Sequence, residues 1–271
     1  MLEHKGVRLG EPCSELISRR SFMGAGLGLI ATTTNPYFHL IKTQTIRIVY
    51  STKFIPLSYL DTNNRMRGFY VELFDEILGR RMGFNVEHIG LPWKRAQLLV
   101  EHGDADVFCT NATITRQAYM NFCQEKVIEN RRMVIFKRGT VLDNTSDTPI
   151  DLSELKGFRH ISYLGNGWAK SNLKEFDVEW ADTSSSAMKI LAQGQADVFV
   201  TGEYQALYRI KSLGLEDQLQ FRPITTKKKS LHRLGIRKSY PDSKKQVDIF
   251  CGHLENMKMD GDFNRLLGQF V

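Results

Sequence analysis

Hydrophobic and polar residues alternate along this chain with the periods of strands and helices in turn. Residues 46–50 alternate as a strand does, and residues 69–82 carry apolar side chains at helical spacing. Residues 84–89 have the pattern of a second strand, and a further helix begins at Pro92 and Trp93. This succession of short strands and amphipathic helices predicts an α/β fold.

One stretch of the chain occurs twice. Residues 103–110 read GDADVFCT and residues 194–201 read GQADVFVT. In each copy an amphipathic helix ends at glycine, which tolerates positive φ, and a short buried strand ends in threonine. Two such units predict two similar lobes, although a single copy would also suit an ordinary turn. Because ligands bind beyond the carboxyl ends of strands in open α/β sheets, we expect Thr110 and Thr201 beside a ligand cleft.

The second half of the chain continues the same alternation. Residues 140–148 form a polar linker that is rich in Asp, Thr and Ser. Residues 241–259 predict a long amphipathic helix, and residues 263–270 predict a last one.

Composition and charge narrow the classes of function. The 271 residues carry a formal net charge of +7, and 42% of them are hydrophobic. The basic residues are dispersed, so we expect no nucleic-acid partner. The four cysteines have no metal-binding spacing, so we expect neither a metal nor a cofactor. Cys109 suits a buried thiol, and a disulfide between Cys109 and Cys123 is left open.

The N-terminal segment has the pattern of a targeting signal. Two arginines, Arg19 and Arg20, precede Phe22 and a glycine-rich apolar run, which resembles the twin-arginine export signal of bacteria. We therefore assign residues 1–36 to export and expect the protein in the periplasm, tethered to the membrane if the signal is not cleaved. A chance pair of arginines before an apolar helix is the alternative.

Three spaced motifs carry a resemblance to a known family. They are D-x-N-N-x-x-x-G-F at 61–69, T-N-A-T-I-T at 110–115 and D-L-x-x-L-K-G at 151–157. In this order they resemble the family 3 solute-binding proteins of bacterial ABC uptake systems, the polar amino-acid type. The resemblance implies a type II periplasmic-binding-protein fold, in which two α/β lobes are joined by two crossing strands. The lobes close on a solute in the cleft between them by a hinge.

The resemblance also implies a division of the chain and a set of partners. Residues 45–137 form lobe one, residues 138–231 form lobe two, and residues 232–271 form the return strand and the C-terminal helices that pack on lobe one. We expect a monomer that binds a small molecule and delivers it to the membrane permease of an ABC transporter.

The family's ligand contacts can be carried over to lobe one residue by residue. The aromatic residue of the first loop falls at Phe54, with Tyr59 nearby, and aromatic rings offer flat apolar area. Trp93 is either a wall of the cleft or part of the core. Asn111 and Thr113 match two polar positions that suit a carboxylate or a sugar hydroxyl.

The carboxylate-binding arginine of the family departs from its usual place. Its position falls at Ala118, whereas Arg116 lies two residues earlier. On a helical turn that places Arg116 about 200° away. A standard α-amino acid is therefore a doubtful ligand.

In lobe two the acid that holds an ammonium group is also displaced. Its position falls at Gly202, and Glu203 either replaces it or begins a helix, where acids favour the dipole. Asn166 and Gly167 open a turn that exposes N–H groups to an anion, and Trp168 is placed to stack on the ligand.

Three functions fit this pattern. The first, which we predict, is capture of a small polar solute, amino-acid-like or another small organic molecule, for uptake. The second is a ligand-sensing module for a separate receptor. The third is an enzyme similar to the cyclohexadienyl dehydratases of this fold, for which Glu203 and His160 are the candidate acids. We predict that the chain is not an enzyme, because it lacks the motifs of nucleophilic, phosphate-binding and metal chemistry.

Overall fold

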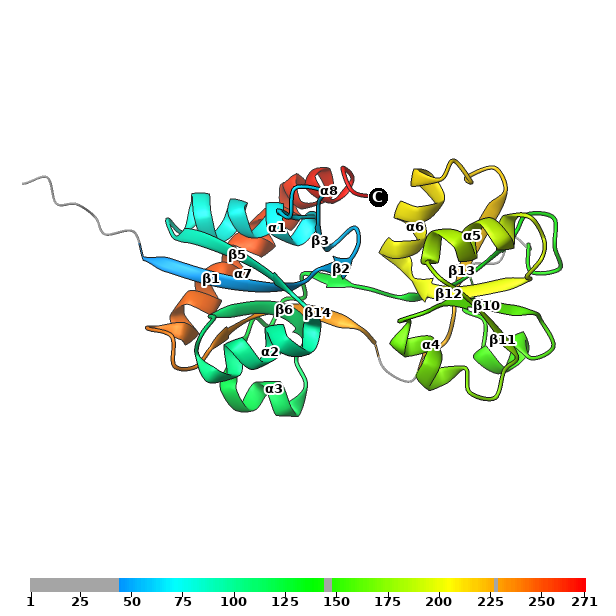
Figure 1. The fold of residues 1–271 in the computed structure, drawn as a ribbon. Coiled ribbons are helices and arrows are strands. Elements are labelled where there is room, and N and C mark those ends of the chain that lie inside the picture. The colour runs from blue at the N-terminus through cyan, green and yellow to red at the C-terminus, as the bar shows by residue number, and fades with distance from the viewer. Residues whose placement is uncertain (1–43, 144–147, 227–228) are drawn as a thin grey trace, which may run out of the picture. The chain divides into compact units, whose positions relative to one another are not determined.

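A computed structural model describes residues 44–143, 148–226 and 229–271. The predicted export signal at 1–36 lies outside the described residues, and the polar linker at 140–148 lies partly outside them. The elements below follow the labels of Figure 1.

The first sheet has the order β5-β1-β6-β14-β7, with β8 paired to β14. β1 is parallel to β5 and β6, whereas β14 is antiparallel to β6, β7 and β8. The strands predicted at 46–50 and 84–89 are confirmed as β1 and β5. The bounds are β5 Asn85–Leu91, β1 Thr45–Ser51, β6 Val107–Asn111, β14 Leu231–Arg237, β7 Met120–Phe122 and β8 Ile128–Glu129.

Helices cover both faces of the first sheet (Figure 1). Because side chains alternate along a strand, Ile46 and Ile48 of β1 pack towards α1, α7 and α8, whereas Val49 packs towards α2. The helix predicted at 69–82 begins as α1 and continues as the π-helix η1. The bounds are α1 Phe69–Phe74, η1 Asp75–Arg81, α2 Trp93–His102, α3 Ile114–Tyr119, α7 Ser243–Met259 and α8 Asp262–Leu267.

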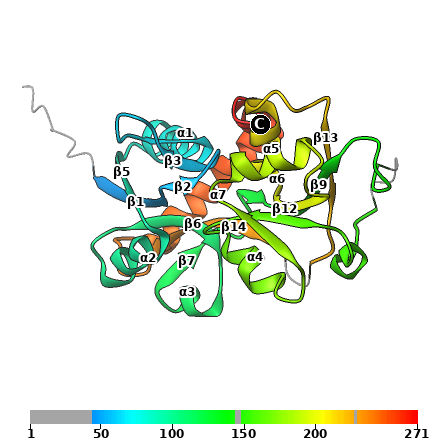
Figure 2. The same ribbon diagram turned by 45° about the vertical axis from the view of Figure 1, so that its right-hand side comes forward.

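The second sheet has the order β11-β10-β12-β9-β13 and is also covered on both faces (Figure 2). Ile135 of β9 packs in the core with α5 and α6, and its neighbours Val134 and Phe136 pack in the core beside α4. The strands are β11 Val178–Ala181, β10 His160–Tyr163, β12 Val198–Gly202, β9 Arg132–Lys137 and β13 Leu219–Pro223. The helices are η2 Leu152–Leu155, α4 Gly167–Asn172, α5 Ser184–Ala192 and α6 Glu203–Ser212.

The repeated aspartate has the same place in each sheet. Asp106 accepts a 2.8 Å hydrogen bond from the backbone N–H of Arg47 and returns one of 2.9 Å to its carbonyl. Asp197 does the same with Arg159, at 2.8 Å and 2.9 Å. In both copies the arginine side chain also pairs with the aspartate. The aspartate of the repeat therefore ties the start of β6 to β1 in the first sheet and the start of β12 to the start of β10 in the second.

A small third sheet lies before α1. It consists of β2 Lys53–Phe54, β3 Ser58–Leu60 and β4 Met66–Arg67. Gly68 joins β4 to α1 with a φ of 118°, and a Cβ there would lie 2.6 Å from the carbonyl oxygen of Pro56. Only glycine fits this approach, which sets the first loop against the sheet.

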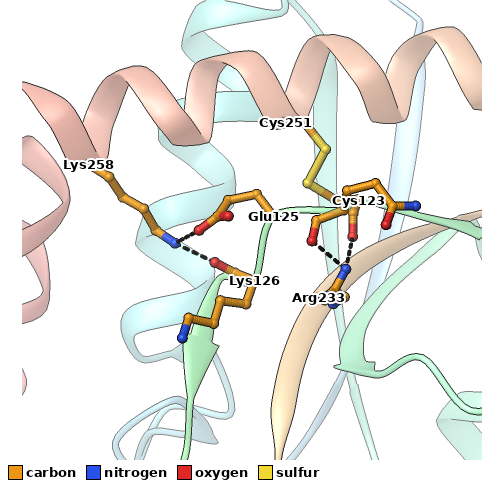
Figure 3. Close-up of a disulfide and its surroundings, with 7 residues drawn as sticks. Cys123, Glu125, Lys126, Arg233, Cys251 and Lys258 are labelled. Atoms are coloured by element: carbon orange, nitrogen blue, oxygen red, sulfur yellow. Dashed lines mark hydrogen bonds and ion pairs between the residues drawn. A yellow bond between two sulfur atoms is a disulfide. The ribbon is translucent and has the colours of Figure 1, made fainter.

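A disulfide joins Cys123, which follows β7, to Cys251 on α7 (Figure 3). The pairing of Cys109 with Cys123 that the sequence left open is therefore not the one formed, and Cys109 is a free thiol. Lys258 on the same helix pairs with Glu125. The bridge and the ion pair both fasten the C-terminal helix to the first sheet.

Two segments lead from one sheet to the other. The outgoing chain passes from β8 to β9, and the return runs from β13 to β14. They are hydrogen-bonded to each other where the N–H of Asn130 donates to the carbonyl of Ser230 at 2.9 Å, and that of Ile224 to Arg132 at 2.9 Å. The two sheets agree with two α/β lobes, and the lobe boundaries given above stay a prediction.

Candidate functional site

Arg116 lies against the carboxyl end of β6. Its guanidinium donates to the Gln97 side chain at 2.8 Å and 3.0 Å, to the carbonyl of Asn111 at 2.9 Å, and to Thr110 Oγ1 at 3.4 Å. It also lies over the ring of Trp93, 5.6 Å from the centroid. Within the described residues no carboxylate is in ion-pair distance of this side chain. Burial lowers the pKa of Arg116, so its charge lacks full compensation.

Trp93 serves two neighbours at once. Its ring packs edge-on against Phe108, with centroids 5.7 Å apart, and so belongs to the core beneath α2. It also carries Arg116 in a cation–π contact. Its contact with Phe108 agrees with a place in the core, and its role as a wall of the cleft stays a prediction.

Asn111 and Thr113 flank a large hollow of about 1710 Å³. Thr113 is exposed and caps α3, where its Oγ1 accepts from the backbone N–H of Arg116 at 3.4 Å. The Asn111 amide donates to Ser230 Oγ at 3.3 Å, across to the return segment. Both residues thus lie at the junction of the first sheet with the crossing segments.

His232 lies on β14 directly opposite Asn111 and was not among the predicted site residues. Its Nδ1 is 2.6 Å from the hydroxyl of Tyr70, and its Nε2 is 3.3 Å from Ser230 Oγ. Phe54 stacks on the imidazole with centroids 5.7 Å apart. The sequence offered only the alternating strand pattern around His232, which does not tell a buried imidazole from a solvated one.

The charge state of His232 follows from its surroundings. Burial, together with the positive charges of Arg132 and Arg116, lowers its pKa to about 4. The imidazole is therefore neutral at pH 7. Both arginines act on one ring, so both lie within electrostatic reach of the end of β14.

Tyr59 lies on β3 and is half-buried. Burial raises its pKa, and the neighbouring Tyr208 of α6 contributes in the same direction. The ring therefore lies near residues of the second lobe.

In the second lobe, Asn166 is buried and caps α4. Its Oδ1 accepts from the N–H of Ala169 at 3.2 Å, and its Nδ2 donates to Ser162 Oγ at 3.1 Å. Gly167 begins that helix, and Trp168 follows it with its ring facing Arg132. The amide of Asn166 is engaged within its own lobe, and Trp168 borders the hollow.

Glu203 begins α6, as its helix-starting reading predicted, and is paired with Arg131. The Arg131 Nε donates to the Glu203 carboxylate at 2.9 Å, and the pairing raises the pKa of the arginine. Thr201 lies buried in β12, opposite Met133 of β9. The carboxylate of Glu203 is thus neutralised by a fixed cation.

His160, considered as a general acid, lies in the core of the second lobe. Its Nε2 is 2.9 Å from the carbonyl of Leu155, and its ring packs against Phe176. It does not border the hollow. Among the residues that the structure describes, no cluster of histidine, cysteine and acidic side chains could hold a metal ion. The same residues include no helix with the length and apolarity to cross a membrane.

Known proteins share both sequence and fold with this chain. The model of the bacterial extracellular solute-binding proteins, family 3, matches residues 46–271. A probable histidine-binding protein of Neisseria gonorrhoeae is 25% identical over 46% of this chain and 44% of its own length. A probable amino-acid-binding protein of Bacillus subtilis (strain 168), YxeM, is 25% identical over 62% of this chain and 63% of its own.

A solved structure extends the likeness to the whole fold. An ancestral cationic amino acid solute binding protein superposes with a TM-score of 0.66 at 19% identity, covering 83% of this chain and 95% of that one. The chain spans less than two thirds of the two curated relatives, whereas the family model covers the described residues from β1 to the C-terminus. The predicted two-lobed fold is confirmed, and this chain belongs to family 3 of the bacterial extracellular solute-binding proteins.

Proposed function

We propose that this chain captures a small organic anion and delivers it to the membrane permease of an ABC transporter. The observation that carries the proposal is Arg116, a half-buried guanidinium at the carboxyl end of β6 with neutral partners only. The guanidinium keeps its charge although its hydrogen bonds to Gln97, Thr110 and Asn111 use most of its N–H groups. An incoming carboxylate would replace these neutral acceptors with charge-assisted hydrogen bonds.

The same site argues against an α-ammonium group on the solute. The family's ammonium-binding acid is replaced by Gly202, and a Cβ at that glycine would lie 2.9 Å from the Asn130 side chain. Glu203, the next residue, is neutralised by Arg131. An ammonium group on the solute would therefore find neither residue able to offset its charge. This favours a solute that carries a carboxylate without an ammonium group.

The remaining parts of the role rest on the family and on the sequence. We propose that the protein works as a monomer in the periplasm, exported by the twin-arginine route, and that binding closes its lobes without chemical change to the solute. The residues at the mouth of the hollow, Asn111, Thr113 and Trp168, would complete the ligand contacts, with Phe54 supporting them through His232.

A thermal-shift panel tests the proposal. The purified chain is melted with carboxylates, amino acids, polyamines, sugars and nucleosides. A solute at 100 times its Kd adds about 2.7 kcal/mol and raises the Tm by several degrees. We expect carboxylates to give the shift, and the recovered solute to be unchanged.

Variants then assign the effect to Arg116. Arg116→Gln should abolish the carboxylate shift, whereas Arg95→Gln, an exposed arginine on neighbouring α2, should keep it. A shift produced only by cationic or neutral solutes, and retained in Arg116→Gln, would refute an anion-binding function. A chemically altered solute would point to the enzyme alternative.

A further inference from the structure

Arg132 is the basic residue with which β9 begins, and in the part of the chain that the structure describes its side chain contacts an aromatic ring and no acceptor. The guanidinium lies over the Trp168 ring, 5.2 Å from the centroid. Over the described ranges it makes neither a side-chain hydrogen bond nor an ion pair. It is half-buried, and burial lowers its pKa. A desolvated guanidinium with five unused donors is costly unless a ligand supplies the acceptors.

The other basic residues that border the hollow differ from Arg132. Arg131 is paired with Glu203, and Arg233 donates to the carbonyl of Cys123 at 3.3 Å. Lys238 donates to the carbonyl of Ala118 at 3.1 Å, Lys229 lies 3.9 Å from the carboxylate of Glu129, and Lys244 is exposed to solvent. Arg132 therefore combines burial, free donors and a position on the hollow.

Several polar side chains that border the hollow together with Arg132 are neutral. Asn111, Thr113 and Gln117 come from the first lobe, and Asn172 follows Trp168 on α4. The acids that border the hollow are engaged elsewhere or solvated: Glu129 pairs with Lys126 at 2.9 Å, Asp151 accepts from Ser153, and Asp248 is exposed. The surroundings of Arg132 thus favour an incoming anion over an internal one.

We propose that Arg132 and Trp168 form a second anion subsite, so that the solute is an organic dianion with one carboxylate on Arg116 and the other on Arg132. This inference rests on the proposed function, because it assumes that Arg116 holds a carboxylate. The guanidinium of Arg116 donates to the carbonyl of Asn111 at 2.9 Å, and Asn111 borders the same hollow as Arg132. A dicarboxylate would offset both arginines at once, which a monocarboxylate cannot do.

The contact of Arg132 with Trp168 restrains the guanidinium without using its N–H groups. Free guanidinium N–H groups can bind a carboxylate through two parallel hydrogen bonds. Lysine at this position would keep the charge and lose the fork that makes this pairing possible.

Titration calorimetry with matched ligands tests the subsite. Succinate, glutarate, adipate and phthalate are compared with their own monoamides, which keep the shape and one carboxylate. We expect at least one diacid to bind about tenfold or more tightly than its monoamide, as one charge-assisted hydrogen-bonded pair provides. Arg132→Gln should reduce that diacid to the affinity of the monoamide and leave the monoamide unchanged.

Three further variants separate the possible failures. Arg116→Gln should weaken both ligands, Arg132→Lys should keep only part of the diacid preference, and Arg138→Gln should change neither. Arg138 is a suitable control because it is exposed and bound to Gln220 at 3.0 Å. If monoacids bind through Arg116 but Arg132→Gln and Arg132→Lys leave the diacid affinity unchanged, the second subsite is wrong and the proposed function stands. If no carboxylate binds the unaltered chain, both are wrong.

Discussion

The disulfide between Cys123 and Cys251 should supply a large part of the stability of this protein. Cys123 is fully buried beside the first sheet, and Cys251 lies on α7, 128 residues further along the chain (Figure 3). The bridge therefore closes a loop that contains the whole second sheet. Replacing both cysteines with alanine removes the constraint and leaves α7 attached by its apolar face, which includes Phe250 and Leu254.

The size of the effect follows from the loop length. In the chain-entropy treatment a bridge over a loop of this length restricts the unfolded chain by about 5 kcal/mol at 25 °C. For a protein of this size each 1 kcal/mol corresponds to about 2–4 °C in Tm. We therefore expect the double alanine variant to melt about 10–20 °C below the unaltered protein.

Calorimetry on the oxidised, the reduced and the double-variant proteins measures this difference. Cys109→Ala is the control, because Cys109 is a free thiol in the same lobe. Thiol titration of an unfolded preparation of the exported protein should find Cys109 alone before reduction and all three cysteines of the described chain afterwards. A melting point that reduction moves by less than about 3 °C, or three reactive thiols without reductant, would refute the reasoning.

Two further predictions concern buried charge. Asp106→Asn should lower the free energy of unfolding in urea by about 3 kcal/mol, because the aspartate side chain is 2% exposed and pairs with two arginines. Asp197→Asn should lower it by about 1 kcal/mol or less, because that side chain is 35% exposed. Equal losses in the two variants would contradict this reasoning. For His232, the folded pKa of about 4 lies below the ordinary value of 6.5, so the unfolded chain binds a proton first as the pH falls. Stability should therefore decline by about 3 kcal/mol from pH 6.5 to pH 4, and His232→Gln should show a shallower decline in the same assay.

The elements of this fold were predictable because their patterns are local. A strand buried on one or both faces and a helix with one apolar face each leave a period in the sequence, and β1 and β5 lie where that period placed them. The ends of helices were also predictable from glycine: Gly103 ends α2 with a φ of 90°. The predicted helix at 241–259 begins two residues late because Asp242 takes a left-handed conformation, with a φ of 52°.

Pairings between distant residues left no comparable signal. Cys123 is joined to Cys251 across the second lobe, and the spacing of four cysteines allows several partners. In the same way, the ion pair of Glu203 with Arg131 connects residues 72 positions apart. This ion pair makes Glu203 a poor binding group for an ammonium ion, because Arg131 already offsets the charge of its carboxylate. Contacts of this kind are decided by the packing of the sheets, after the local elements have formed.

Arg116 shows why helical geometry alone misjudges a long side chain. Two residues along a helix turn the Cβ by about 200°, so the Cβ of Arg116 points away from the position of the family's arginine. Arg116 however lies in the first turn of α3, where the capping residue Thr113 exposes the helix end to the carboxyl end of β6. From there the long side chain extends to β6, where the guanidinium donates to Thr110 Oγ1 and to the carbonyl of Asn111. The guanidinium therefore lies at the carboxyl end of β6 although Arg116 is two residues away from the family's position. Whether such an arginine can bind a ligand depends on the length of its side chain as well as on the direction of its Cβ.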